Sequence, residues 1–180
     1  WLEQQAVDFV VVGDGILLSY NGTAAEVTVP DSVRMIAGYA FATNTVITAV
    51  TVPATVGTVD AFSFSGCKAL QTVTLAEGVQ SVGAYAFHWC TSLREICLPD
   101  SVQEIGNHAF AYCKSLKHVR LSTGMTRISN TAFSGCESLQ CVEIPDSVTE
   151  IATQANASGR WRLRPSVCCA FWGKAVRCCM

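Results

Sequence analysis

Large apolar residues recur along this chain every 23 residues, and the polar residues between them keep the same period. The aromatic column of the pattern, called the Phe column below, is Phe41, Phe64, Phe87, Phe110 and Phe133. A second column, called the Cys column, is Cys67, Cys90, Cys113 and Cys136. Further columns of Val, Ile and Leu run in phase with these, without a single insertion. A fixed period of this length is typical of solenoids and propellers, so the pattern predicts units that stack on one another.

One repeat, CTSLREICLPDSVQEIG at 90–106, shows how a unit is expected to fold. The alternation of apolar and polar residues around Ile96 predicts a short strand, and Pro99 ends its hydrogen-bond ladder. Val102 and Ile105 are three residues apart and are expected to point back into the core. A single coil cannot bury its own apolar edge. We therefore expect successive coils to stack, with their strands parallel and about 4.8 Å apart.

The consensus Ile/Val-x-x-x-Ala-Phe-x-x-Cys-x-x-Leu-x-x-Val-x-Leu/Ile-Pro-x-x-Val resembles the BspA-like leucine-rich repeat family. The resemblance covers about 27–151, which is roughly two thirds of the chain. It implies a repeat solenoid, a leucine-rich-repeat right-handed coil with one parallel β-sheet face. It also implies a surface or secreted protein used in adhesion and partner binding, and it is the only basis for a cell-surface location.

The ends of the chain differ from the repeats and suggest three segments. Residues 1–26 contain Gly-Asp-Gly at 13–15 between apolar runs and are expected to form an N-terminal β-hairpin cap, followed by about six repeats over 27–151. Residues 152–180 form an atypical basic, Cys-rich tail with no acidic residue. This tail is either an unusual cap or the end of a cut array. Because the chain begins with Trp1 and not Met, we expect the true N-terminus to lie upstream or to have been removed.

Ten cysteines raise the question of disulfides, metal or lipid. The Cys column lies where stacked coils need a small apolar side chain, so buried, unpaired thiols are expected there. No Cys-x-x-Cys spacing is present, so zinc-ribbon and thioredoxin interpretations lack their motif. The pairs Cys168-Cys169 and Cys178-Cys179 in the tail leave disulfides or lipidation open.

Composition narrows the class of protein. Half of the residues are apolar and 14% are charged, which favours a large core over disorder. The net charge of −2 gives no electrostatic case for nucleic acid as a partner. No run of 18 apolar residues exists, so no membrane span is predicted. A monomer without a cofactor is expected.

The strand face is the surface on which we expect a partner to bind. In each predicted strand, the residues that flank the buried central Val or Ile point outward. These positions are rich in Thr in the first half of the array and charged in the second half. The candidate partner-binding face is Thr51, Thr72, Thr74, Glu95, His118, Arg120 and Glu143. Since Arg is over-represented among the residues that dominate interfaces, Arg120 is expected to contribute most.

A metal site and a ligand-binding aromatic column are two further interpretations of outward side chains. Glu95, His118 and Cys141 fall in one outward column, and such a trio could hold a transition metal. A solvated polar face with an incidental cysteine is the favoured alternative. Outside the strands, a column of mostly aromatic residues is expected to shield the outer side of the coils rather than to bind a ligand. Its members are Tyr39, Phe62, Tyr85 and His108.

The sequence thus predicts a non-enzymatic protein-interaction or adhesion module whose partner is a protein or cell-surface ligand. The motifs G-x-S-x-G, P-loop and H-E-x-x-H are all missing from the chain. A structural spacer within a longer surface repeat protein is the first alternative. A metal-binding protein or enzyme is the remote one.

Overall fold

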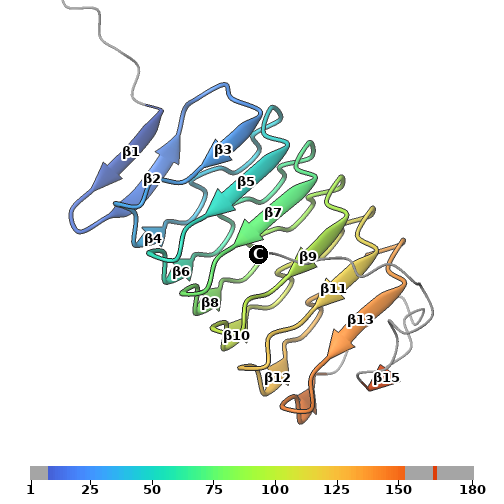
Figure 1. Ribbon diagram of the computed structural model, residues 1–180. Coiled ribbons are helices and arrows are strands. Elements are labelled where there is room, and N and C mark those ends of the chain that lie inside the picture. The colour runs from blue at the N-terminus through green and yellow to red at the C-terminus, as the bar shows by residue number, and fades with distance from the viewer. Residues whose placement is uncertain (1–7, 153–163, 166–180) are drawn as a thin grey trace, which may run out of the picture.

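The computed structural model describes residues 8–152 and 164–165, which form a parallel β-solenoid of about 6 turns (Figure 1). No helix occurs within these ranges. The predicted leucine-rich-repeat solenoid is therefore confirmed. The two Cys-Cys pairs of the tail lie outside the described residues, as does most of the segment 152–180.

The longer strand of each coil lies on one side of the solenoid. These strands are β3 (Glu26–Thr28), β5 (Ala49–Val52), β7 (Thr72–Leu75), β9 (Glu95–Cys97), β11 (His118–Arg120) and β13 (Cys141–Ile144). They pair in parallel as two sheets, β3-β5-β7 and β9-β11-β13, and the second sheet continues into β15 (Arg164–Pro165). Each paired residue lies opposite its equivalent in the next repeat, as in Val50↔Val73 and Val119↔Val142. The 23-residue period therefore sets the register.

A second ladder of two-residue strands runs along another side of the coils. Its members are β4 (Met35–Ile36), β6 (Thr58–Val59), β8 (Ser81–Val82), β10 (Glu104–Ile105), β12 (Arg127–Ile128) and β14 (Glu150–Ile151). In β4 to β12 the second residue is buried, as expected for Ile105, and the first faces outward. The sequence analysis did not predict this ladder. Two residues are too few to show the alternation that marks a strand.

An antiparallel hairpin precedes the first coil. Strand β1 (Phe9–Val12) pairs with β2 (Ile16–Tyr20), and β2 pairs in parallel with β4. Gly13 and Gly15 in the connecting turn have φ values of 52° and 91°, a left-handed conformation that glycine adopts without steric strain. The hairpin covers the edge that the first coil would otherwise expose.

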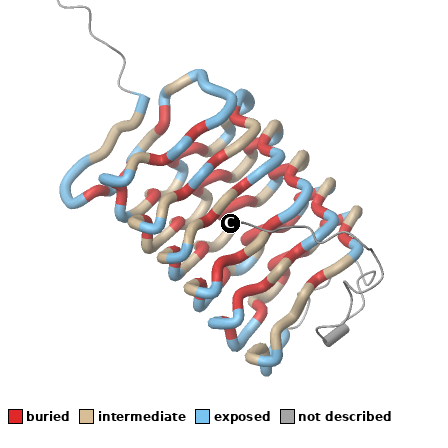
Figure 2. Tube along the Cα trace, viewed as in Figure 1, coloured by how far each residue is buried: buried red, intermediate tan, exposed pale blue. Residues whose placement is uncertain are grey.

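The core is a column of stacked rings. Successive members of the Phe column have ring centroids 4.6 to 5.6 Å apart and planes within 10° of parallel. Tyr20 of the hairpin extends the stack, with its centroid 5.3 Å from that of Phe41. All five phenylalanines are buried, and buried positions follow one another from coil to coil through the array (Figure 2). The Phe column is therefore the interior of the solenoid.

The segment that joins each short strand to the next long strand has an unusual backbone, called the turn segment below. The residues two before and two after each Phe of the Phe column have positive φ, as at Tyr85 (59°) and Trp89 (59°) around Phe87. Between these positions the chain bonds to its neighbour: the N–H groups of Phe64 and Gly66 donate to carbonyls of the next coil at 2.8 and 2.7 Å. The corresponding peptide groups in other coils bond in the same direction.

Candidate functional site

The strand face is formed by two outward columns on either side of the buried central residue of each long strand. The first column is Glu26, Ala49, Thr72, Glu95, His118 and Cys141. The second column is Thr28, Thr51, Thr74, Cys97, Arg120 and Glu143. Pairing aligns each column within each of the two sheets, so neighbours in a column lie about 4.8 Å apart.

The structure divides the candidate face at the boundary between the two sheets. Thr51, Thr72 and Thr74 lie on the β3-β5-β7 sheet, where the first two are exposed and the third is half-buried. The charged half lies on the second sheet. There Glu95 and His118 are exposed and directly paired, and Arg120 is paired in register with the half-buried Glu143. The boundary thus separates a threonine-rich surface, with Glu26 at its far edge, from a charged one.

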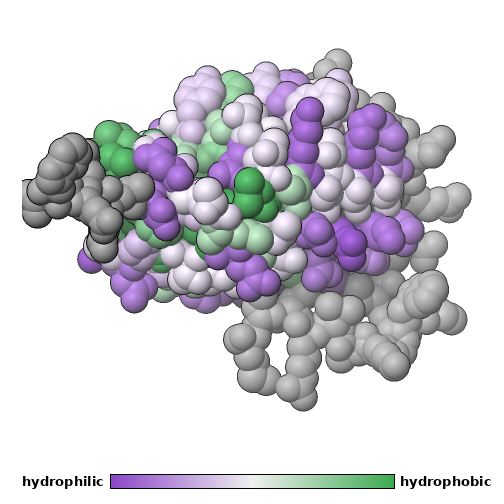
Figure 3. All heavy atoms as spheres, turned by 90° about the horizontal axis from the view of Figure 1, so that it is seen from above, coloured by the Kyte–Doolittle hydropathy of each residue, from purple (hydrophilic) through white to green (hydrophobic). Residues whose placement is uncertain are grey.

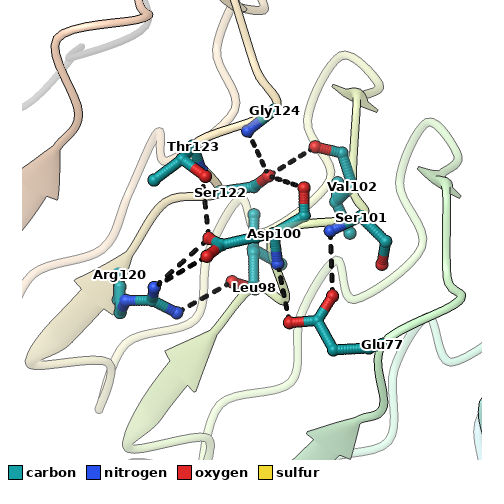
Figure 4. A network of polar contacts seen from close by, with 9 residues as sticks. All are labelled: Glu77, Leu98, Asp100, Ser101, Val102, Arg120, Ser122, Thr123 and Gly124. Carbon is teal, nitrogen blue, oxygen red and sulfur yellow. Dashed lines mark hydrogen bonds and ion pairs between the residues drawn. The ribbon is translucent and has the colours of Figure 1, made fainter.

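Side chains link the coils at this boundary, where β7 and β9 form no strand ladder. The Glu77 carboxylate accepts hydrogen bonds from the N–H of Asp100 at 3.0 Å and of Ser101 at 3.1 Å. The Ser101 hydroxyl accepts from the N–H of Gly78 at 2.9 Å and donates to the Val79 carbonyl at 2.8 Å. Glu77 is thus a link between coils and is held close to the strand face (Figure 4).

Arg120 is part of the same polar network. Its Nη2 donates to Oδ1 of Asp100 at 3.2 Å, and its Nη1 donates to the Leu98 carbonyl at 3.4 Å (Figure 4). The side chain keeps 38% of its surface exposed. Because a guanidinium has five N–H donors, Arg120 still has donors available to a partner while Asp100 fixes its position. These bonds therefore fix the position of the Arg120 side chain on the strand face.

Asp100 connects this network to the next coil. Its Oδ1 accepts the N–H of Thr123 at 3.2 Å. That hydrogen bond lowers the pKa of the Asp100 carboxyl below its ordinary value of 3.8; burial opposes this, and the Arg120 charge adds to the lowering. The hydrogen bond from Thr123 is the largest of these effects. Asp100 is therefore a carboxylate at neutral pH, as its pairing with Arg120 requires.

The predicted register brings Glu95, His118 and Cys141 next to one another across β9, β11 and β13. Even so, within residues 8–152 and 164–165, no group of three or more His, Cys, Asp or Glu side chains could hold a metal ion. Adjacent positions in a column are thus insufficient for a metal site. The strand face offers hydrogen-bonding and charged groups for contact.

Two columns that were not among the predicted site residues border the strand face. The column immediately before the long strands includes four exposed polar side chains: Gln71, Arg94, Lys117 and Gln140. The column after them includes four acidic residues: Asp31, Glu77, Asp100 and Asp146. Both recur at the same 23-residue period, which is the signal that could have revealed them. The charged half of the face therefore has a basic border and an acidic border.

The Cys column has a structural role. Its four thiols are at most 2% exposed, and each Sγ donates to the carbonyl of a Phe in the preceding coil at 3.0 to 3.2 Å. Burial raises the pKa of Cys67 and of Cys136 to about 12, and it raises the pKa of Cys90 and Cys113 well above 9.0. The prediction of buried, unpaired thiols is confirmed. These cysteines remain protonated and are not nucleophiles at neutral pH.

Aromatic rings line the turn segments on the outside of the coils. The predicted outer column is a continuous stack, with ring centroids 5.1, 4.7 and 4.6 Å apart from Tyr39 to His108. Tyr39 at the end of this column is 65% exposed, so part of the column faces solvent. A shorter stack, Trp89 on Tyr112, was not foreseen. On the face seen in Figure 3, hydrophobic side chains form small separate groups among hydrophilic ones.

Comparison with known proteins agrees with this geometry. The coils and their two parallel ladders define a leucine-rich-repeat solenoid protein. The sequence pattern described as BspA type Leucine rich repeat region matches residues 34–159 in 6 copies. The chain belongs to this family.

Solved structures of bacterial proteins are similar to the chain. A T. pallidum leucine-rich repeat protein shares 28% identity with a TM-score of 0.72, and the match covers 80% of this chain and 78% of that one. A leucine rich cell surface protein from Faecalibacterium prausnitzii shares 25% identity with a TM-score of 0.70, covering 83% of this chain and 39% of that one. The pneumococcal vaccine antigen PcpA shares 20% identity and the fold, with a TM-score of 0.73, covering 83% and 37%.

The chain thus spans most of the first of these proteins and less than half of the other two. It matches no curated protein sequence at a significant level. Among the described residues, no helix is long and apolar enough to cross a membrane.

Proposed function

We propose that this chain is a non-enzymatic interaction module that binds a protein or cell-surface ligand on its strand face. The observation that carries the proposal is the division of that face into a threonine-rich surface and a charged surface with Arg120 held in place. Stacked coils hold these groups in fixed positions, so little side-chain freedom is lost on binding. The partner that fits best has an acidic group for Arg120 and a polar, uncharged surface for the threonines.

Extracellular display is part of the same proposal. One similar structure is that of a protein described as a leucine rich cell surface protein, and another is described as a vaccine antigen. Both are longer than this chain, which covers 39% and 37% of them. A role as a spacer within a longer surface array is therefore the second candidate. It differs from the first in requiring no contact on the strand face.

A pair of double variants with the same change in composition separates the two candidates. Arg120→Ala/Glu143→Ala removes a register pair from the strand face. Arg127→Ala/Glu150→Ala removes an ion pair of the same residue types, 3.2 Å apart, from the other ladder. Each protein would be tested for capture of labelled cell-surface proteins, with the bound proteins identified by mass spectrometry.

The strand-face proposal predicts that the Arg120/Glu143 variant loses a captured partner by about tenfold or more, while the Arg127/Glu150 variant retains it. Equal capture by both variants and by the unmodified chain would exclude the strand face. Absence of any reproducible partner in this assay would favour the spacer.

A further inference from the structure

Two exposed aromatic rings lie in the turn segments, away from the long strands. Trp89 and Tyr112 belong to equivalent positions of successive coils, and each is 40% exposed. Their rings are stacked, with centroids 5.0 Å apart and planes 16° from parallel. Tyr112 thus covers one face of the indole ring of Trp89.

The other face of Trp89 has no ring stacked on it among the described residues. The equivalent position in the preceding coil is Gly66, which has no side chain. Its N–H donates to the carbonyl of His88 at 2.7 Å, so Gly66 lies directly beside the backbone next to Trp89. At the other end of the column, Tyr112 lies over Gly135, where an added Cβ would be 2.6 Å from the ring. Side chains in this column therefore lean toward the following coil, and the position that would cover Trp89 is the one left empty at Gly66.

Two polar side chains, Thr43 and His88, lie next to Gly66 and to Trp89 and are taken as the border of this ring face. Cγ2 of Thr43 lies 3.4 Å from the position of a Cβ at Gly66. The imidazole of His88 meets the Trp89 ring edge-on, with centroids 6.1 Å apart and planes at 85°. Burial, together with the nearby charge of His108, lowers the pKa of His88, so its imidazole is neutral at pH 7 and has one donor and one acceptor. The border of the ring face therefore consists of Thr43 beside Gly66 and a neutral imidazole beside Trp89.

Trp89 and Tyr112 share the positive φ that every coil has at this position. Trp89 and Tyr112 have φ values of 59° and 60°, a left-handed conformation that is strained for bulky side chains. Gly66 and Gly135, with φ values of 75° and 70°, occupy the same position of the coil without that strain. The array thus carries rings at positions where glycine fits better.

We propose that the open face of Trp89 is a saccharide subsite that takes one neutral pyranose ring. The face of an aromatic ring is electrically negative and attracts polarised C–H groups, which a pyranose presents on its apolar side. A sugar in this position would turn its edge hydroxyls toward the two neighbouring polar side chains, Thr43 and His88. A quaternary ammonium ligand needs several ring faces around it, and a nucleotide needs basic partners, so both fit this border less well.

This subsite is separate from the strand face, and its test uses different variants. Binding of unmodified chain to a panel of neutral mono- and oligosaccharides would be measured by glycan array and by calorimetry. Trp89→Ala removes the ring. Gly66→Asn keeps Trp89 and places a side chain over its open face, and asparagine tolerates the left-handed backbone at this position better than other residues with side chains. Circular dichroism would establish that both variants remain folded.

We expect at least one neutral saccharide to bind, and both variants to weaken that binding by about tenfold or more. Tyr39→Ala is the matched control, because Tyr39 is the more exposed ring at 65% but has a different border. It should retain binding, as should Arg120→Ala on the strand face. The proposal is overturned if no neutral saccharide binds at millimolar concentration, if Gly66→Asn binds as well as the unmodified chain, or if Tyr39→Ala reduces binding as much as Trp89→Ala.

Discussion

The buried Cys column predicts that the array loses stability in mild alkali. Cys113 has no exposed surface, and its Sγ donates to the Phe87 carbonyl at 3.1 Å. Burial raises the pKa of this thiol well above its ordinary value of 9.0. Above pH 9 the unfolded chain therefore releases a proton that the native protein keeps. The free energy of unfolding must fall as the pH rises from 9 toward the native pKa.

The magnitude follows from the two pKa values. At pH 10 a thiol of ordinary pKa is mostly ionised, so one buried thiol removes about 1.4 kcal/mol of stability relative to neutral pH. Four such thiols remove about 5–6 kcal/mol, which is comparable with the total stability of 5–15 kcal/mol typical of folded proteins. The array is therefore expected to unfold in a narrow alkaline range.

Cys113→Ala isolates the contribution of one thiol. At pH 7 we expect the variant to be less stable by about 1–3 kcal/mol, from lost contacts and an unpaired carbonyl. At pH 10 this difference should shrink by about 1.4 kcal/mol, because the variant no longer has the group that titrates. Both values come from urea unfolding followed by circular dichroism in the presence of a reductant.

Leu116→Ala is the matched control, since Leu116 is equally buried, bonds to the same turn and does not titrate. Its destabilisation should be the same at both pH values. If the difference between the unmodified chain and Cys113→Ala stays constant from pH 7 to pH 10, the Cys column does not resist ionisation and the reasoning is wrong.

Three further outcomes are expected. Phe110→Ala should lower the free energy of unfolding by about 3–5 kcal/mol, because it leaves a cavity between two stacked rings; an unchanged melting temperature would contradict this. Asp100→Asn should cause a small loss of stability at pH 7 that disappears as the pH falls below 3.8, since a carboxylate of lowered pKa stabilises the native state only while ionised. A thiol reagent should leave the Cys column unlabelled in the native protein and label it after denaturation, and rapid native labelling would argue against burial.

Most of the fold could be predicted from the sequence because the 23-residue period sets the register of the coils. A constant period of 23 residues places Val50 opposite Val73 and His118 opposite Glu95, so the register of the long strands followed directly. The same period identified the Cys column as buried. These features depend on spacing and hydrophobicity, which can be read directly from a single sequence.

Other features depend on geometry that spacing does not contain. The pairing of Arg120 with Asp100 depends on side-chain conformation and joins residues that are 20 positions apart, not 23. Positive φ at Tyr85 and Trp89 departs from the usual preference for glycine in that conformation, so the residue types at these positions did not predict it. The columns continue unchanged from β7 to β9, so they did not predict that these two strands form no ladder.

The direction of the hydrogen bonds around the Phe column makes the two ends of that column chemically different. Around each Phe of the Phe column the N–H groups donate toward the following coil, so the first coil presents carbonyls at this place to whatever precedes it. The hairpin meets this need, because the Tyr20 N–H donates to the Ala40 carbonyl at 2.9 Å. A terminating segment at the other end must supply acceptors instead. Shortening or lengthening the array by whole 23-residue units preserves this polarity, whereas a copy of the hairpin moved to the opposite end would meet donors with donors.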